Sequence, residues 1–530
     1  MNPKKPFYKK PVFYVIAAIV ILAVIVVVLA LNHDRKMDPD PTPDTPPQTE
    51  GGAALPMGEV ELIDYKFDDF TMKPRNNASV TLPVEGQLAL PAGTERVPVV
   101  FVLHPAPRGG EGETANGYYG GYENLLNSLA ERGIAAVSIN IAPQYATAFG
   151  EYDRQNAILM EHINRLMRAV TGEETNFPKD ITGRLDFENL GLIGHGEAAT
   201  GLFSAAEMTL SNVGVKLRGL LLVSPNTTFT AETRKLDVPT AILEAATPMS
   251  GANYDGMDIF EELAGDNLRD GFAVLTTLEE GSAYDFNSRL GSDGSDRYQS
   301  FLGDYAADFF NTIFTRVNTF VPIGMSVREP DELYGMPARS LVVSPKRKLI
   351  LHPTGLDDEK MSKVHGDIMK NLATLQVVTD SEDASRDTAG SFVGPGSGER
   401  MYYRIRWEQK GATVVVILPP GEQDLTGYES LSLMLAVDPT DSLNKAQEQS
   451  FSVALTDVEK TRSSVTLSGR AALRMTAADG QPSALGEIRI PLDEFDEAHL
   501  KQIGAIELSF DQTDSGSILL WDLSLQKEIE

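Results

Sequence analysis

The sequence predicts an α/β domain followed by an all-β domain, both carried behind a membrane-spanning helix. Three observations lead to this fold class: an uncharged apolar run near the N-terminus, strand-like runs that alternate with helical stretches up to about residue 340, and short strands separated by turn residues after that. Alternating strands and helices are typical of a doubly wound, mostly parallel sheet with helices on both faces. Many short strands with polar turns are typical of an antiparallel β-sandwich.

The membrane helix is predicted at residues 11–31, from Pro11 to Leu31, where no residue is charged. About twenty apolar residues cross the ~30 Å hydrocarbon core of a bilayer as a helix. Lysines precede this run and aspartates follow it, so the positive-inside rule places residues 1–10 in the cytoplasm and the bulk of the chain outside. A cleaved signal peptide is the alternative, but the run is long for one and no Ala-x-Ala site follows it. We expect an uncleaved signal-anchor, which makes this a single-pass protein of the cell membrane.

The segment between the anchor and the first domain, residues 32–57, is rich in proline and aspartate and has no periodic apolar positions. Such a composition forms a semi-rigid, solvated linker.

The chain has 530 residues, a net charge of -29 and no cysteine. The charge argues against nucleic acid as a partner. The absence of cysteine excludes disulfides, thiol catalysis and cysteine-based zinc sites, and it fits a bacterial cell surface.

Residues 58–340 carry the alternating pattern of the α/β domain. Several of its strand candidates are apolar throughout, as expected for strands buried on both faces. The expected strands are Val99–Leu103, Ala135–Ile141, Leu190–Ile193, Gly219–Val223, Thr240–Leu243 and Ala273–Thr277, with Val80–Leu90 before them as an antiparallel hairpin arm. The expected helices are Tyr122–Arg132, Arg154–Val170, Ala198–Leu210 and Gly256–Glu262.

One segment of this domain, Asp186–Gly201, reads DFENLGLIGHGEAATG, a strand that runs into a glycine-rich turn and a helix. Together with the earlier strand that ends in LHP, it resembles the α/β-hydrolase fold, and more narrowly bacterial lipase/esterase-like members whose elbow reads Gly-His-Ser-Arg-Gly-Gly. In that family a serine nucleophile sits on the sharp turn between strand and helix. The resemblance covers the whole α/β domain and implies a hydrolase fold for it.

The nucleophile elbow of this chain is degenerate. Its five positions are Gly194, His195, Gly196, Glu197 and Ala198, so that Gly196 stands where the family has serine. Glycine adopts the strained backbone of such a turn at little cost. The resemblance therefore implies that the turn is kept while the acyl-enzyme route is lost.

The other members of a catalytic triad are missing as well. The family's histidine falls at Ala283 or Tyr284, and neither can act as an imidazole base. The acid position falls at residues 247–249, which read Thr-Pro-Met, with Asp255 and Asp258 as later candidates. In the oxyanion loop His104 is followed by a proline, which has no N–H to donate. We expect His104 to cap its strand by hydrogen bonding, and a catalytic role is the alternative.

Three residues near the elbow could still carry chemistry. Ser224 ends a strand and Thr200 lies one turn into the elbow helix, but a hydroxyl is a weak nucleophile without a base to activate it. Glu197 could act as a general base on water. The alternative for Glu197 is a solvated or arginine-paired carboxylate.

Residues 345–530 show the all-β pattern, with period-2 alternation in segments such as Ser450–Asp457. Eight strands are expected in the segments YYRIRWEQ, ATVVVILP, SLSLMLAV, SFSVALTD, SSVTLSG, EIRIPLDEF, AIELSFD and SILLWDLSLQ. DLTGYESLSLMLAV, EIRIPLDEFD and IGAIELSFDQTDSGSILLWDLSL together resemble galactose-binding-like jelly rolls, which occur in several carbohydrate-binding modules. The resemblance implies a binding module, and its motifs mark strand ends rather than a ligand site.

Sugar binding requires exposed aromatic side chains that stack on the rings. The candidates for ligand binding are Tyr402, Tyr403, Trp407 and Tyr428, with packing inside the sandwich as the alternative. No metal site or cofactor is expected, although a structural calcium ion near Asp424 and Asp522 stays open, as such folds often hold one.

Three functions follow from these observations. The first is a membrane-anchored, extracytoplasmic pseudoenzyme of the hydrolase fold that binds a glycan, cell-wall or protein ligand. The second is an active esterase or lipase with an unrecognised nucleophile. The third is a structural component of the cell envelope. The missing serine and histidine favour the first over the second.

Overall fold

The fold is described from a computed structural model of the whole chain. It describes residues 59–529 except for 75–77, 94, 108–116, 148–150, 211–212, 226–236, 248–254, 266–268, 325–331, 380–399, 445–447, 475–484 and 496–498. The expected cytoplasmic tail, anchor and linker lie outside these residues, and so do Pro248 and Met249 of the acid loop. Within the described part, no helix is both long enough and apolar enough to span a bilayer. Residues 55–530 form one compact unit.

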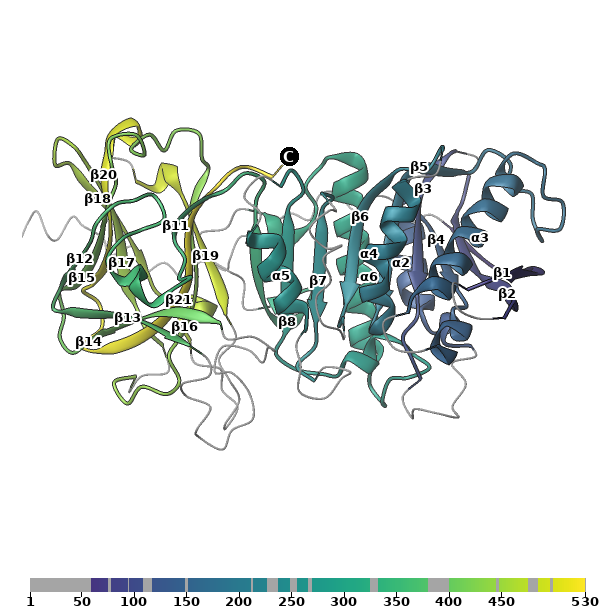
Figure 1. Cartoon of the computed structure of the whole chain (residues 1–530), viewed down its shortest axis with the longest axis horizontal. Coiled ribbons are helices and arrows are strands. Elements are labelled where there is room, and N and C mark those ends of the chain that lie inside the picture. The colour runs from purple at the N-terminus through teal and green to yellow at the C-terminus, as the bar shows by residue number, and fades with distance from the viewer. Residues whose placement is uncertain are drawn as a thin grey trace, which may run out of the picture. The chain divides into compact units, whose positions relative to one another are not determined.

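The first half of this unit is built on a mixed, ten-stranded sheet (Figure 1). Its strand order is β1-β2-β4-β3-β5-β6-β7-β8-β10-β9. The six strands from β4 to β8 in this order run parallel, while β1, β2, β10 and β9 pair antiparallel. The strands are β1 Val60–Met72, β2 Val80–Pro91, β3 Val97–Leu103, β4 Ala135–Ile139, β5 Leu185–His195, β6 Leu217–Val223, β7 Thr240–Glu244, β8 Ala273–Leu278, β9 Glu332–Leu333 and β10 Met336–Val343.

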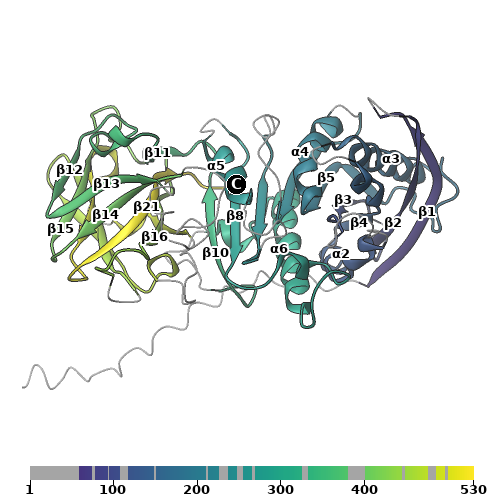
Figure 2. The same ribbon diagram turned by 60° about the horizontal axis from the view of Figure 1, so that its bottom comes forward.

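Helices cover both faces of this sheet, because alternate residues of its buried strands point to opposite sides. The helices are α2 Glu123–Glu131, α3 Asp153–Val170, α4 Glu197–Leu210, α5 Asp255–Gly265 and α6 Asp296–Thr315. In β3, Phe101 belongs to a core shared with α3, α4 and α5, whereas Val100 and Val102 belong to a second core shared with α2 and α6. Figure 2 shows the two sets of helices on opposite sides of the strands.

The mixed α/β sheet predicted from the sequence is confirmed, with all six expected strands, the hairpin arm and four helices in place. Strands β1, β9 and β10 and helix α6 were not predicted. The edge strand β1 carries charged residues on its exposed face and reads VELIDYKFDDFTM. Helix α6 and strand β10 follow the last predicted strand, and β10 turns back to pair antiparallel with β8.

The second half of the unit consists of two antiparallel sheets, as predicted. One has the order β13-β14-β21-β16-β19, with β11 also paired to β21, and the other has the order β12-β15-β20-β17-β18. A single core, which includes Trp407 and Phe510, takes residues from both sheets. The strands are β11 Lys348–Leu351, β12 Ile368–Asn371, β13 Ala373–Thr379, β14 Met401–Trp407, β15 Ala412–Ile417, β16 Ser430–Val437, β17 Phe451–Asp457, β18 Arg462–Leu467, β19 Gly486–Pro491, β20 Ile503–Phe510 and β21 Gly516–Gln526.

The antiparallel part covers the free edge of β10. The short strand β9 pairs only with the first two residues of β10, and an open strand edge exposes unpaired backbone groups. The backbone N–H of Val342 donates to the buried carboxylate of Glu487 at 2.7 Å, and that of Ser344 donates to the side-chain oxygen of Gln526 at 2.8 Å. Side chains of β19 and β21 therefore satisfy backbone donors of the ten-stranded sheet.

A buried ion pair lies beside this edge. The guanidinium of Arg347 donates to Asp522 at 3.0 Å and to the backbone oxygen of Ala264 in α5 at 2.9 Å. Both charged side chains are at most 1% exposed. Because an unpaired buried charge is costly, this contact ties the chain just after β10 to β21 and to the end of α5.

Candidate functional site

The candidate site is the turn between β5 and α4, at the carboxyl edge of the parallel strands. Gly196 occupies this turn with φ of 62°, in the left-handed region that glycine adopts without strain. A Cβ atom at Gly194 would lie 2.5 Å from the Cα of Ala199, so strand and helix approach closely only because these residues are small. The N–H of Gly196 donates to the backbone oxygen of Val223, which fixes the turn against β6.

His195 is fully buried and joins three segments of the chain. The hydroxyl of Tyr122, at the start of α2, donates to its Nδ1 at 2.8 Å, and its Nε2 donates to the backbone oxygen of Ala283 at 2.8 Å. These partners assign the proton to Nε2. Burial lowers the pKa of His195 to about 3, so the imidazole is neutral near pH 7. Both nitrogens are engaged, which leaves neither available to a nucleophile.

The loops after β7 and β8 meet beside this imidazole. The N–H of Thr247 donates to the backbone oxygen of Gly281 at 2.9 Å, and the N–H of Ala283 donates to that of Thr247 at 2.9 Å. Ala283 is fully buried and Tyr284 is half-buried. The described residues at the positions expected for nucleophile, acid and base therefore lie on neighbouring segments, and they are glycine at 196, threonine at 247, and alanine and tyrosine at 283 and 284.

His104 lies at the end of β3 and bonds to backbone groups. Its Nε2 accepts the N–H of Ile141 at 3.0 Å, and its Nδ1 donates to the oxygen of Pro105 at 3.0 Å. Burial lowers the pKa of His104 to about 4. The ring is thus a neutral cap that holds β3 to the end of β4, and no nitrogen is left for catalysis.

Glu197 is the first residue of α4 and is half-buried. Burial raises the pKa of its carboxyl group. Among the described residues, no arginine, lysine or histidine lies within ion-pair distance of this carboxylate, and no group donates a hydrogen bond to it. The expected arginine partner is therefore not found in the described part of the chain.

The two candidate hydroxyls near the elbow are buried. Ser224 follows β6, is 1% exposed and has φ of 42°, a left-handed conformation that is unusual for serine. Its Oγ and the Oγ1 of Thr200 have no hydrogen-bond partner among the described residues. Since both nitrogens of His195 are engaged elsewhere, neither hydroxyl has the base that a nucleophile requires.

Three of the four aromatic residues proposed for sugar stacking lie in the core. Tyr402 is 1% exposed, and Tyr403 and Trp407 are fully buried. Burial removes the open ring face that a sugar would stack on, so the interpretation of these three as ligand residues is corrected. Tyr428 is half-buried and packs against the sandwich core, with the ammonium of Lys527 5.9 Å from its ring centre.

The two aspartates considered for calcium have separate partners. Asp424 is exposed, and its carboxylate accepts from the N–H and the hydroxyl of Thr426. Asp522 is buried and paired with Arg347. Over the described residues, no group of three or more histidine, cysteine, aspartate or glutamate side chains is arranged to hold a metal ion.

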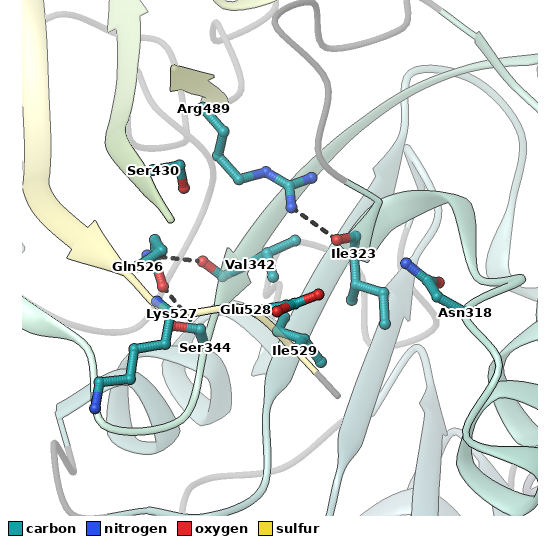
Figure 3. Close-up of a pocket in the computed structure, with 10 residues that line it drawn as sticks. All are labelled: Asn318, Ile323, Val342, Ser344, Ser430, Arg489, Gln526, Lys527, Glu528 and Ile529. Atoms are coloured by element: carbon teal, nitrogen blue, oxygen red, sulfur yellow. Dashed lines mark hydrogen bonds between the residues drawn. The ribbon is translucent and has the colours of Figure 1, made fainter. Parts of the chain in front are cut away.

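A small pocket lies away from the elbow, beside the covered edge of β10 (Figure 3). Its volume is about 180 Å³, below the ~300 Å³ at which ligand pockets usually begin. The guanidinium of Arg489 donates to the oxygen of Ile323, and the amide of Gln526 bonds to both Val342 and Ser344. Its polar groups therefore hold the two halves of the unit together.

Comparison with known proteins gives no match, either to a protein family or to a curated protein. The assignment of the site thus depends on its geometry.

Sequence reasoning missed the tyrosines that contact His195 and His104. Tyr122 bonds to His195, and the hydroxyl of Tyr145 donates to the backbone oxygen of His104. The rings of Tyr118 and Tyr145 lie 6.1 and 5.8 Å from that of His104. No periodic pattern marks these residues, because they come from turns and helix starts that only the fold brings together.

Replacement of His195 by glutamine tests whether the imidazole is a structural group that stays neutral in the folded protein. In the unfolded chain this histidine takes up a proton below its ordinary pKa of about 6.5, while in the folded chain His195 stays neutral down to about pH 3. Protonation therefore favours the unfolded state, and the stability of the protein falls as the pH is lowered between these values. This cost is about 1.4 kcal/mol per pH unit. Glutamine can supply one acceptor and one donor and does not titrate.

The free-energy difference between wild type and His195→Gln should therefore shrink by about 2 kcal/mol between pH 7 and pH 5, as measured by urea unfolding. The same substitution at exposed His365 is the matched control and should leave the pH dependence unchanged. An equal free-energy difference between wild type and variant at pH 7 and pH 5 would show that His195 is not held neutral.

Proposed function

We propose that this chain is a membrane-anchored, extracytoplasmic pseudoenzyme with an α/β-hydrolase-like domain and a jelly-roll-like sandwich, and that it acts by binding a ligand. The elbow carries the argument. Gly196 holds the strand-to-helix turn in a left-handed conformation without offering a nucleophilic atom.

The arrangement around the elbow supports the finer assignment to a hydrolase-like fold. In α/β hydrolases the nucleophile stands on the turn after a central strand, and the acid and histidine follow in that chain order. Here Gly196, Thr247 and Ala283 follow one another in the same order, on loops that meet at His195. The scaffold of a triad is kept while each of its reactive groups is replaced.

The antiparallel part supports a binding role less directly. Two sheets around one core agree with a galactose-binding-like jelly roll, the class that the sequence resembles. Because Tyr402, Tyr403 and Trp407 are buried, a glycan, cell-wall or protein ligand of this domain would have to use its loops or Tyr428. Through its contacts to β10, the domain also covers the edge of the ten-stranded sheet.

The alternatives make different demands on the site. An active ester hydrolase would need a nucleophile such as Ser224 with a base in reach, and the neighbouring imidazole is fully engaged. A structural envelope component would need no ligand at all. Only binding experiments distinguish a structural envelope component from the binding protein that we propose.

Hydrolysis of model esters tests whether the site lacks catalytic activity. The purified full chain in a maltoside detergent should hydrolyse p-nitrophenyl acetate and butyrate no faster than buffer with a heat-denatured sample, where an ordinary hydrolase turns over about 1–1000 times per second. Ser224→Ala and Glu197→Gln should leave this background unchanged. Turnover that is lost in Ser224→Ala would establish the enzyme alternative, and turnover that neither variant affects would show that the site lies elsewhere.

Membrane fractionation tests the anchor. The full chain should pellet with membranes and resist extraction by carbonate, whereas a variant that lacks residues 1–31 should appear in the soluble fraction. Protease added to intact cells should degrade the body of the chain, because the positive-inside rule places it outside. A mature N-terminus near residue 33 in protein sequencing would replace the anchor with a cleaved signal peptide.

A further inference from the structure

A buried cluster of charged groups lies where the chain passes from the ten-stranded sheet into the sandwich. The connection is strand β11, with Arg347 directly before it and His352 directly after it. β11 pairs with β21, and Asp522 of β21 accepts from the guanidinium of Arg347. The same guanidinium donates to the backbone oxygen of Ala264 at the end of α5. This short segment therefore holds α5 to the sandwich.

His352 lies in the cluster with one ring nitrogen unsatisfied. Its Nδ1 is 3.7 Å from the carboxylate of Asp522, which is too far for a hydrogen bond, and no described residue offers another partner. The side chain is 18% exposed, and its ring meets the edge of Trp521 with 5.0 Å between the ring centres. Trp521 in turn lies against Phe260 of α5. The imidazole is thus a mostly buried, titratable group at the contact between α5 and the sandwich.

The acidic groups that face this ring are already paired with other cations. Asp522, on β21, is bound by Arg347 at 3.0 Å. Glu261, on α5 next to the phenylalanine that contacts Trp521, is bound by Arg400 at 3.0 Å. A protonated His352 would therefore share a carboxylate with an arginine that holds it at shorter distance.

A second cation lies on the other side of β11. The backbone N–H of Lys363 donates to the oxygen of Ile350, and its ammonium group pairs with Asp358 at 2.9 Å. Protonation of His352 would thus add an unmatched positive charge between Arg347 and Lys363. Burial of an unmatched charge is unfavourable, and burial lowers the pKa of His352 below its ordinary value.

We propose that residues 347–352 form a pH-sensitive latch, in which uptake of a proton by His352 loosens the contact between α5 and the sandwich. The latch is closed when the ring is neutral, with Arg347 bound to both Asp522 and Ala264. It opens when the charged ring moves out to water. This inference concerns the junction of the two halves and does not depend on the proposed binding function.

The direction of the pH effect follows from the two states of the ring. In the open latch His352 has its ordinary pKa of about 6.5, whereas burial lowers the pKa in the closed latch. The closed state is therefore at full strength above about pH 6.5, and it weakens as the pH falls from there toward the lower pKa. Glu487, the buried acid of β19, acts in the opposite direction, because burial raises its pKa and acid favours its buried form. A variant of His352 alone separates the two effects.

Hydrogen–deuterium exchange of the full chain in a maltoside detergent, read by mass spectrometry at pH 7.5 and pH 5.5, tests the latch. After correction for the intrinsic exchange rate, peptides that cover β11 and the end of α5 should open at least threefold more often at pH 5.5. One pH unit between the two pKa values changes the opening constant by up to about tenfold. His352→Gln, which does not titrate, should abolish this change, and exposed His365→Gln should keep it.

Tryptophan fluorescence gives a second readout, because Trp521 is one of two tryptophans and touches the ring of His352. A protonated imidazole quenches indole fluorescence more strongly than a neutral one. The intensity of the wild type should fall on acidification with a midpoint below pH 6.5, and that of His352→Gln should not. Thermal melts at pH 8 show whether the variant keeps the fold, and His352→Asn takes its place if it does not.

The latch is overturned if the β11 peptides of the wild type show no response to pH, or if His352→Gln keeps that response. An equal difference between wild type and variant in the peptides of α2 would also overturn it, since the effect of His352 would then lie in global unfolding. These outcomes leave the proposed binding function untouched, because its failure is read separately from turnover of p-nitrophenyl esters.

Discussion

One buried imidazole determines how the carboxyl edge of the ten-stranded sheet is assembled. His195 bonds to the start of α2 on one side and to the loop after β8 on the other, while its own backbone ends β5. A charged ring could not accept the hydrogen bond from Tyr122, so the arrangement requires a neutral histidine. Burial keeps the ring neutral, and it also prevents the ring from taking part in proton transfer.

In our proposal, the loss of chemistry and the retention of the fold have the same physical basis. A serine at the turn after β5 would adopt the left-handed backbone only with strain, which an enzyme tolerates because it needs the hydroxyl. Gly196 relieves that strain, and Ala283, one of the two positions at which the resemblance implies a histidine base, is small and buried. What remains beside the turn is a set of polar groups, such as His195 and His104, whose hydrogen bonds hold the neighbouring segments in place.

The antiparallel half contributes stability as well as surface. An open β10 would expose backbone donors, and Glu487 and Gln526 accept two of them. The buried pair of Arg347 and Asp522 strengthens the same junction. The two halves are therefore joined by directional, buried contacts, whereas the proline-rich stretch before residue 58 has the composition of a solvated linker.

Much of the fold could be predicted because its strands are apolar runs bounded by turn residues. Runs such as Val99–Leu103 mark buried parallel strands by composition alone, and the alternating strands of the sandwich follow from period-2 patterns. Helix α6 was missed, since its aromatic and polar residues do not stand out as one apolar stripe. The elbow was identified because its glycine-rich turn is local in sequence.

The partners of the elbow were harder to predict, because they depend on contacts between distant segments. Tyr122 lies 73 residues from His195, and nothing local in the sequence connects them. Ala283, 88 residues away, was expected near the elbow only through the family resemblance, and its hydrogen bond to His195 was not foreseen. The stacking role proposed for Tyr402 and Trp407 failed for a related reason. Alternation shows that a strand is half-buried, but which face meets the second sheet is decided by tertiary packing.

The central claim is that the elbow has no activated nucleophile, and covalent labelling tests it most directly. A fluorophosphonate reacts with serines that a base activates, and intact-mass spectrometry detects one added phosphonyl group. The full chain should show no adduct under conditions in which a serine hydrolase added to the same sample is fully labelled. A stoichiometric adduct mapped to Ser224, or to any other serine near Gly196, would contradict the account.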